Sequence, residues 1–200
     1  GLPSTVRERE FRSEIADAVS QAMVKLVDSF SVLEDTETHL PFGWRPLVFM
    51  KIPVLTSYAL QSEGDNYFVK AVSAQSSSAI VKPMKIDLKE FPILHWRWKT
   101  DKIFDKPDAR LKDGDDYVAR VFVGFNYDPS KARGWEKAKY GWAKMLYGYY
   151  PPKNALDYVW DKDLPEGTSF KSPYTDRVRV VVAESGGSGA PLSSCINAQR

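Results

Sequence analysis

Residues 93–99 read Ile-Leu-His-Trp-Arg-Trp-Lys, an alternation of apolar and basic side chains that decides how the rest of the chain is interpreted. Successive side chains of a β-strand point to opposite faces of the sheet. Trp96 and Trp98 therefore share one face, and three basic residues share the other. This pattern is typical of a strand with one buried and one solvated face. We predict that the two tryptophans belong to the core of a β-sheet protein.

Outward from this stretch, short runs rich in β-branched and aromatic residues alternate with Gly, Pro, Ser and Asp, which predicts consecutive strands. The predicted strands are Leu47–Lys51, Ser57–Ser62, Tyr67–Ala74, Ser78–Ile86, Ile93–Lys99, Tyr117–Asn126, Leu156–Trp160 and Arg177–Glu184. Eight short strands favour a mainly β fold, an antiparallel β-sandwich of the jelly-roll kind.

Two segments are predicted to be helical. From Val6 to Phe30 apolar residues recur at steps of three and four, which favours a helix packed on a sheet over a partner-binding or membrane-surface helix. The insertion Ser130–Leu146 is basic and helical in tendency, and an aromatic, proline-rich segment follows it. We divide the chain into an N-terminal helix and linker (1–40), a β-sandwich domain (41–185) and a flexible tail (186–200).

Composition excludes several classes of protein. The 200 residues carry 28 Lys and Arg against 26 Asp and Glu, so the net charge of +2 offers no electrostatic footprint for a nucleic acid. No apolar run is long enough for a membrane helix. The single Cys195 excludes an intramolecular disulfide and a multi-thiolate metal site. No nucleotide-binding motif occurs, so we predict no cofactor. The oligomeric state is not set by the sequence.

Candidate ligand-binding residues are basic and aromatic. If their strands lie in one sheet, Arg97, Arg120 and Arg179 line one surface with His95, Asp116 and Phe122. Guanidinium groups bind carboxylates and sulfates in bidentate fashion, and aromatic rings such as those of Tyr149 and Trp160 stack on sugars. The alternative is that each arginine pairs across strands with Asp116, Asp157 or Glu184.

Catalytic and metal-binding candidates are fewer. Asp116 and His95 are the candidate acid and base, and a carboxylate pair could also combine Asp115 or Asp116 with Asp157, Glu166 or Glu184. In the acidic stretch 112–116, Asp113 and Asp115 are candidate calcium ligands. Asp and Gly are also the usual residues of a turn that precedes a strand, and we favour the turn.

Six stretches carry a resemblance to a known family. They are 43–49 (Gly-Trp-Arg-Pro-Leu-Val-Phe), 91–99 (Phe-Pro followed by the opening stretch), 112–123 (Lys-Asp-Gly-Asp-Asp-Tyr-Val-Ala-Arg-Val-Phe-Val), 146–152 (Leu-Tyr-Gly-Tyr-Tyr-Pro-Pro), 154–160 (Asn-Ala-Leu-Asp-Tyr-Val-Trp) and 172–179 (Ser-Pro-Tyr-Thr-Asp-Arg-Val-Arg). From Gly43 to Ser185 the chain resembles a bacterial family of unknown function, DUF3047. The resemblance implies a β-sandwich of extracytoplasmic type, periplasmic or secreted, and it implies no activity.

The resemblance stops near Gly187, where family members continue with further strands. We therefore expect a C-terminally truncated or divergent member that lacks its closing strands and exposes sheet edges. For function, we predict an extracytoplasmic β-sandwich that binds a carbohydrate or a similar ligand, including an anionic one. The alternatives are a saccharide-active hydrolase or lyase that uses Asp116 and His95, and a structural or interaction protein of the cell envelope.

Overall fold

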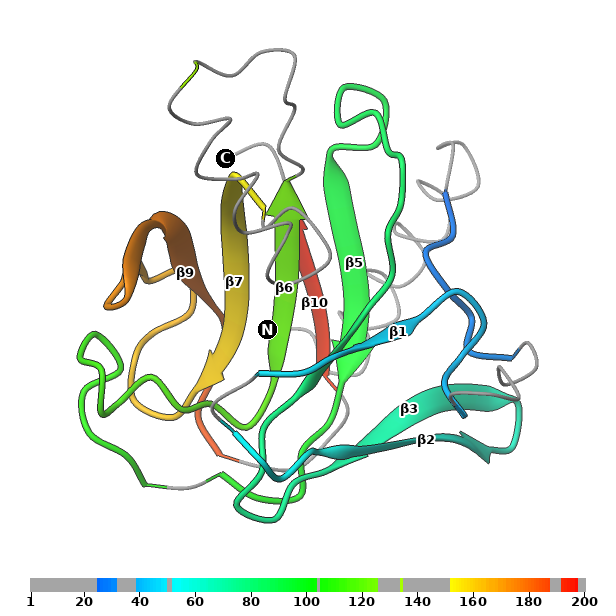
Figure 1. Ribbon diagram of the computed structural model, residues 1–200, viewed down its shortest axis with the longest axis horizontal. Helices are drawn as coiled ribbons and strands as arrows, with labels where there is room; N and C mark the ends of the chain where they lie inside the picture. Colours follow the sequence, from blue (N-terminus) through cyan, green and yellow to red (C-terminus); the bar gives the residue numbers. More distant parts are fainter. Residues whose placement is uncertain are drawn as a thin grey trace, which may run out of the picture. The chain divides into compact units, whose positions relative to one another are not determined.

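The structure is a computed structural model that describes residues 25–31, 39–49, 52–103, 105–125, 134, 152–187 and 192–197. The chain divides into two compact units, a first unit of residues 1–92 and a second unit of residues 93–200. The first unit holds β1 (Arg45–Leu47), β2 (Ser57–Glu63), β3 (Asn66–Val72) and β4 (Ala79–Val81). The second holds β5 (Ile93–Trp98), β6 (Arg120–Phe125), β7 (Asn154–Asp161), β8 (Ser169–Ser172), β9 (Thr175–Ser185) and β10 (Leu192–Asn197) (Figure 1).

The first unit is built from two antiparallel strand pairs, β1 with β4 and β2 with β3. Gly64, with φ of +59°, begins the two-residue turn of the β2–β3 hairpin, where a positive φ matches the twist of the strands. Asp28 joins three segments of this unit. Its carboxylate accepts hydrogen bonds from the Phe30 backbone N–H at 2.8 Å, the Trp44 Nε1–H at 2.8 Å and the Lys82 ammonium at 2.6 Å.

The second unit contains a four-stranded sheet with the order β6-β7-β9-β8 and a two-stranded sheet of β10 and β5. β7 and β9 are parallel neighbours, whereas every other neighbouring pair is antiparallel. The chain leaves β7, passes to the edge strand β8 and returns through β9, which is inserted between them. β10 pairs with β5 over the full length of both strands (Figure 1).

Each face of the four-stranded sheet has its own cover. On one face, Trp96 and Trp98 of β5 pack on two buried aromatic residues of β7, with ring centroids 5.4 Å apart for Trp96 and Tyr158 and 5.8 Å apart for Trp98 and Trp160. On the other face, Val159, Val180 and Val182 are buried with Ala109 and Tyr117 from the long loop before β6. The prediction that both β5 tryptophans belong to the core is confirmed.

The predicted fold class needs correction in two respects. The described elements are strands without a helix. The helix predicted over Val6–Phe30 is wrong at its end, because residues 25–30 are irregular and Phe30 has a φ of +53°. Residues 1–24 lie outside the described residues, as does the predicted helical insertion Ser130–Leu146 except for Gly134. An antiparallel jelly-roll sandwich is wrong as well, because β7 and β9 are parallel.

The strand predictions were most accurate where the sequence alternates clearly. β2, β3, β4, β5, β7 and β9 fall on predicted strands, whereas β1 meets the strand predicted over Leu47–Lys51 only at Leu47. β6 begins three residues later than predicted, so Tyr117 and Asp116 belong to the preceding loop. Two strands were missed: β8, and β10, which lies within the predicted flexible tail. The division of the chain after Pro92 falls inside the predicted domain 41–185, whose outer boundaries remain a prediction.

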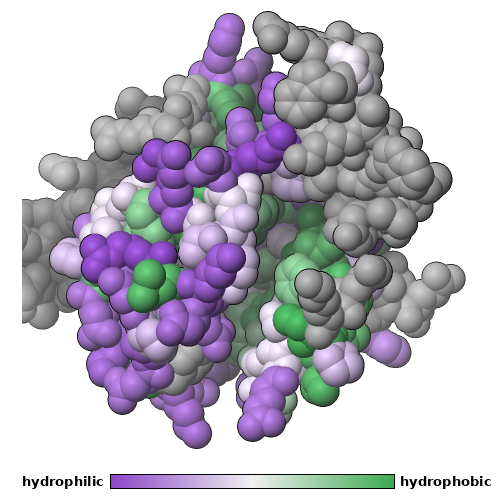
Figure 2. All heavy atoms as spheres, turned by 60° about the vertical axis from the view of Figure 1, so that its left-hand side comes forward, coloured by the Kyte–Doolittle hydropathy of each residue, from purple (hydrophilic) through white to green (hydrophobic). Residues whose placement is uncertain are grey.

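The surface exposes apolar as well as charged residues. Figure 2 shows green, apolar side chains at the surface among purple, hydrophilic ones. In the first unit the exposed large apolar residues include Phe42, Val48, Phe49, Val54 and Leu55. Among the described residues, none belongs to a helix that is long and apolar enough to cross a membrane.

Candidate functional site

The outward face of β5 is an exposed cationic feature that the alternation predicted. Along β5 exposed and half-buried residues alternate, with the tryptophans inward and His95 and Arg97 outward. Lys99, which directly follows the strand, is exposed too. The ion pairs of the described residues involve neither His95 nor Lys99. We call His95, Arg97 and Lys99 the β5 basic row.

The three predicted arginines lie on three different surfaces. Arg97 is on the side of β5 that faces away from the four-stranded sheet. Arg120 and Arg179 both belong to that sheet, but on opposite faces. Arg120 is paired in register with Val159, on the face that the loop before β6 covers. Arg179 is paired with Leu156, on the opposite face, which also carries Tyr158 and Trp160. Arg179 is exposed and donates a hydrogen bond of 3.0 Å to the Ser169 hydroxyl. The prediction that one surface gathers all three is wrong.

Arg120 lies at the centre of a charged network with two carboxylates. Its Nη1 donates to Oδ2 of Asp157 at 2.8 Å, and its Nη2 donates to the backbone carbonyl of Asp115 at 2.6 Å. The Asp115 carboxylate lies 3.4 Å from the same Nη2. About a third of the Arg120 side chain (34%) is exposed, against 3% for Asp157. The alternative interpretation, in which Arg120 pairs with Asp157, is confirmed.

Tyr117 links this network to a second buried ion pair. The Arg120 guanidinium carbon lies 4.6 Å from the centre of the Tyr117 ring, and the Lys106 ammonium lies 3.4 Å from it. Such cations over an aromatic face are attracted by its negative charge distribution. Lys106 pairs with Asp161 of β7 at 2.8 Å, with both side chains buried. Two cation–carboxylate pairs thus flank one ring and fix the loop before β6 to the sheet.

The pKa values of the two buried carboxyl groups, Asp157 and Asp161, shift in opposite directions. Desolvation raises the pKa of Asp157 to about 6, although the Arg120 guanidinium acts to lower it. Its second oxygen, Oδ1, is buried and has no hydrogen-bond partner. The pKa of Asp161 is lowered, because bonds from Lys106 and from the backbone N–H groups of Asp163 and Leu164 outweigh the cost of burial. Desolvation also raises the pKa of the Tyr117 phenol, which donates to the carbonyl of Ala109.

The structure does not bring together the two candidate catalytic residues. His95 is exposed on the outward side of β5, which covers one face of the four-stranded sheet. Asp116 is exposed in the loop that covers the other face. Of the possible carboxylate pairs, Asp115 and Asp157 do lie close to each other, but one guanidinium binds both of them. They therefore do not flank an open space in which a substrate is attacked.

The acidic stretch 112–116 begins with a turn, which spans Leu111–Gly114. Gly114 is buried, and its N–H donates to the carbonyl of Leu111 at 3.2 Å, which confirms the turn interpretation. Asp113 is exposed, and Asp115 is bound by Arg120. Among the described residues, no group of three or more His, Cys, Asp and Glu side chains is placed to hold a metal ion.

The two aromatic candidates have separate positions. Trp160 is 2% exposed and donates its Nε1–H to the carbonyl of Gly186 at 3.1 Å, so its ring belongs to the core of the second unit. Tyr149 lies outside the described residues. The roles predicted for the site residues as ligand contacts stay predictions.

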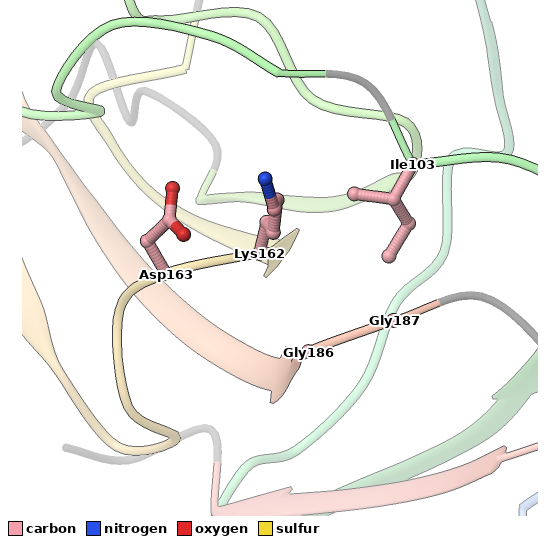
Figure 3. Close-up of a pocket in the computed structure, with 5 residues that line it drawn as sticks. All are labelled: Ile103, Lys162, Asp163, Gly186 and Gly187. Carbon is pink, nitrogen blue, oxygen red and sulfur yellow. The ribbon is translucent and has the colours of Figure 1, made fainter.

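A pocket of about 360 Å³ lies where the parallel strands β7 and β9 end. Lys162 and Asp163 follow β7, Gly186 and Gly187 follow β9, and Ile103 comes from the loop after β5 (Figure 3). In this view the Lys162 side chain stands between those of Asp163 and Ile103. Because Lys162 is paired with Asp105, the pocket presents no unpaired cation to a ligand.

Sequence reasoning missed two members of the buried network, because Lys106 and Asp161 were not singled out. Asp157 was considered, both as a partner of an arginine and as one of a possible carboxylate pair. The sequence did contain a sign of this network. Asp157 and Asp161 are the charged residues of a largely apolar strand, and because they are four positions apart they lie on the same face of it. Buried charges of this kind require a cation nearby. The segment 105–120, which is rich in basic and acidic residues, supplies these cations as Lys106 and Arg120.

Comparison with known protein families yields a match over most of the chain. The family described as "Protein of unknown function (DUF3047)" matches residues 42–192. Neither the curated proteins nor the solved structures contain a match to this chain.

Proposed function

The chain belongs to the DUF3047 family, whose description names no activity, and from its own residues we propose that it binds an anionic saccharide without catalysis through the β5 basic row. The observation that carries this proposal is the alternation along β5, with half-buried, inward-facing tryptophans on one side and exposed basic residues on the other. An extracytoplasmic location, where such polymers are met, is part of the proposal.

The spacing of the row suits a polymer with repeated charges. Alternate residues of a strand are about 7 Å apart, so His95 and Lys99 are separated by about 14 Å along the strand. Such a row matches several anionic groups of one chain better than a single small ion. An arginine in its middle adds bidentate hydrogen bonds to a carboxylate or sulfate.

The support beneath the row is rigid. Trp96 and Trp98 contact each other edge to face at 5.5 Å, and each also packs on an aromatic residue of β7. β10 pairs with β5 along its length, so the backbone of the row is held in a sheet. A binding surface that is already ordered loses less conformational entropy when the ligand arrives.

The test is retention on a sulfated polysaccharide and on a neutral polysaccharide of similar size, at increasing salt concentration. We expect retention on the charged polymer alone, weakened by salt because screening reduces interactions between exposed charges. Arg97→Ala should lower the affinity roughly tenfold, the size expected for a lost charged hydrogen bond. The matched control is Arg110→Ala, which removes another exposed guanidinium, one that is paired with Asp108.

Equal loss of affinity in the Arg97 and Arg110 variants would show that net charge, not the row, governs binding. Retention on both polymers, or on neither, would contradict the proposal.

A further inference from the structure

Arg120 is the one member of the buried network that combines a large exposed surface with a fixed position. A third of its side chain is exposed, while its partner Asp157 is almost fully buried. On the same face of the sheet, Phe122 lies next to Asp157 in the register and is 53% exposed. A guanidinium and an apolar ring are thus presented to solvent side by side on β6. This combination suits a ring-shaped ligand that carries a carboxylate.

The charges around Arg120 oppose such a ligand when they are all ionised. Asp157 of β7 and Asp115 of the preceding loop both bind the guanidinium, which gives this group of three a net charge of −1. The other charged groups nearby are Lys106 and Asp161, beyond the ring of Tyr117, and they neutralise each other. The β9 residues packed on this face, Val180 and Val182, carry no charge.

We propose that Arg120 and Phe122 form a second site, for the carboxylate of a uronic-acid-like ligand, and that the protonation state of Asp157 controls it. With Asp157 protonated, the group of three becomes neutral, and the Arg120 guanidinium keeps one carboxylate partner instead of two. The site then accepts the carboxylate of a ligand whose ring lies on Phe122. With Asp157 ionised, its negative charge repels the ligand and occupies Nη1.

Two features of Asp157 make it able to take up a proton under mildly acidic conditions. Its Oδ1 has no hydrogen-bond partner, so one of its oxygens is buried without compensation. The same burial raises its pKa to about 6, which places the change of charge close to neutral pH. Asp115, which is more exposed than Asp157, is bound by the same guanidinium.

The experiment separates this site from the β5 basic row. All proteins carry His95→Gln and Arg97→Ala, which remove the titratable histidine and the central arginine of the row. Glucuronate is the charged probe and glucose the neutral one. Binding is measured by calorimetry at about pH 7.5 and about pH 5, on either side of the pKa of Asp157. The Arg120 Nε–H resonance reports whether the guanidinium is contacted.

In this background, we expect the affinity for glucuronate to rise about tenfold from the higher to the lower pH, as a nearby charge is removed. The added Asp157→Asn variant should bind at both pH values as tightly as its parent binds in acid. Asp115→Asn should bind more tightly at both pH values and keep its pH dependence. The double variant Arg120→Gln/Asp157→Asn, which removes the guanidinium together with its most deeply buried carboxylate partner, should not bind.

The proposal is overturned if Asp157→Asn keeps the pH dependence of its parent, or if the Arg120 resonance does not move on addition of glucuronate. Binding of glucose with the same affinity would overturn it as well. None of these results bears on the β5 basic row, because its arginine is absent from every protein compared.

Discussion

Replacement of Asp157 by asparagine should stabilise the second unit at neutral pH, although it removes one partner of a buried ion pair. The pKa of this carboxyl is about 6 in the folded protein, against an ordinary value of 3.8. The folded state therefore binds the proton more tightly than the unfolded state does. The Asp157 carboxyl therefore favours folding most at low pH, and its contribution to the free energy of unfolding is lost as the pH rises through about 4 to 6.

The size of the effect follows from the same two values. A pKa that moves from 3.8 to about 6 corresponds to about 3 kcal/mol between the protonated and ionised forms of the folded protein. Asparagine has the shape of the protonated form. The variant should therefore gain up to about 3 kcal/mol at neutral pH and match the native protein near pH 4. Arg120 keeps Asp115 as a partner, so the substitution leaves no isolated buried cation.

The assay is urea unfolding at a series of pH values, followed through tryptophan fluorescence, to which Trp96, Trp98 and Trp160 of the second unit contribute. Asp108→Asn is the control, because Asp108 is exposed and its bond with Arg110 holds its pKa at about 2, outside the window. Glu184, whose pKa is also raised, is present in all proteins and cancels in the difference. Destabilisation of Asp157→Asn at neutral pH would refute the reasoning, because the ion pair would then outweigh the cost of burial.

Three further predictions concern the fold. Trp160→Ala should cost about 3–5 kcal/mol in chemical unfolding, because a fully packed indole is lost, whereas stability within 1 kcal/mol of native would argue against its place in the core. Gly114→Ala should lower the melting temperature and speed proteolysis of the loop before β6, because its Cβ would lie 2.0 Å from the Asp108 carbonyl oxygen; an unchanged cleavage rate would contradict this. Asp28→Asn should destabilise the first unit at neutral pH, because the pKa of Asp28 is lowered and its carboxyl group stabilises the fold only while it is ionised. For the same reason the variant should lose less stability than the native protein as the pH falls. Parallel pH profiles of stability for the two proteins would contradict this.

The sequence predicted the parts of the fold that depend on local alternation. In β5 and β9 the residue pattern alone separates the inward tryptophans and valines from the outward basic residues, and the structure has the same separation. In such strands the alternation of residue types itself shows which face is buried. Local pattern also identified the turn around Gly114, where side chains and backbone interact over a few residues.

The errors arose where pairing between distant segments decides the outcome. β8 is short and polar, and β10 lies in a segment rich in Gly and Ser, so each is a strand only through its partner. Residues 25–30 carry a helical pattern, but Asp28 binds Trp44 and Lys82 instead, which lie far away in sequence. Tertiary contacts of this kind override local propensity.

The candidate site shows the same limit. Alternation assigns Arg120 and Arg179 to a face of their own strands, but only the register between β6, β7 and β9 tells whether the two faces coincide. The parallel arrangement of β7 and β9 was not predicted, and its register puts the two arginines on opposite faces. The pairing of Arg120 with Asp157 was foreseen as an alternative because opposite charges on neighbouring strands attract.

The most direct test of the proposed function is to observe the side chains of the β5 basic row while a sulfated oligosaccharide is added. Nuclear magnetic resonance reports separately on the His95 ring, the Arg97 guanidinium and the Lys99 ammonium. We predict that all three resonances shift with one common dissociation constant, while those of Arg110 stay in place. Shifts at Arg110 as large as those at Arg97, or no shift along the row at saturating oligosaccharide, would contradict the account.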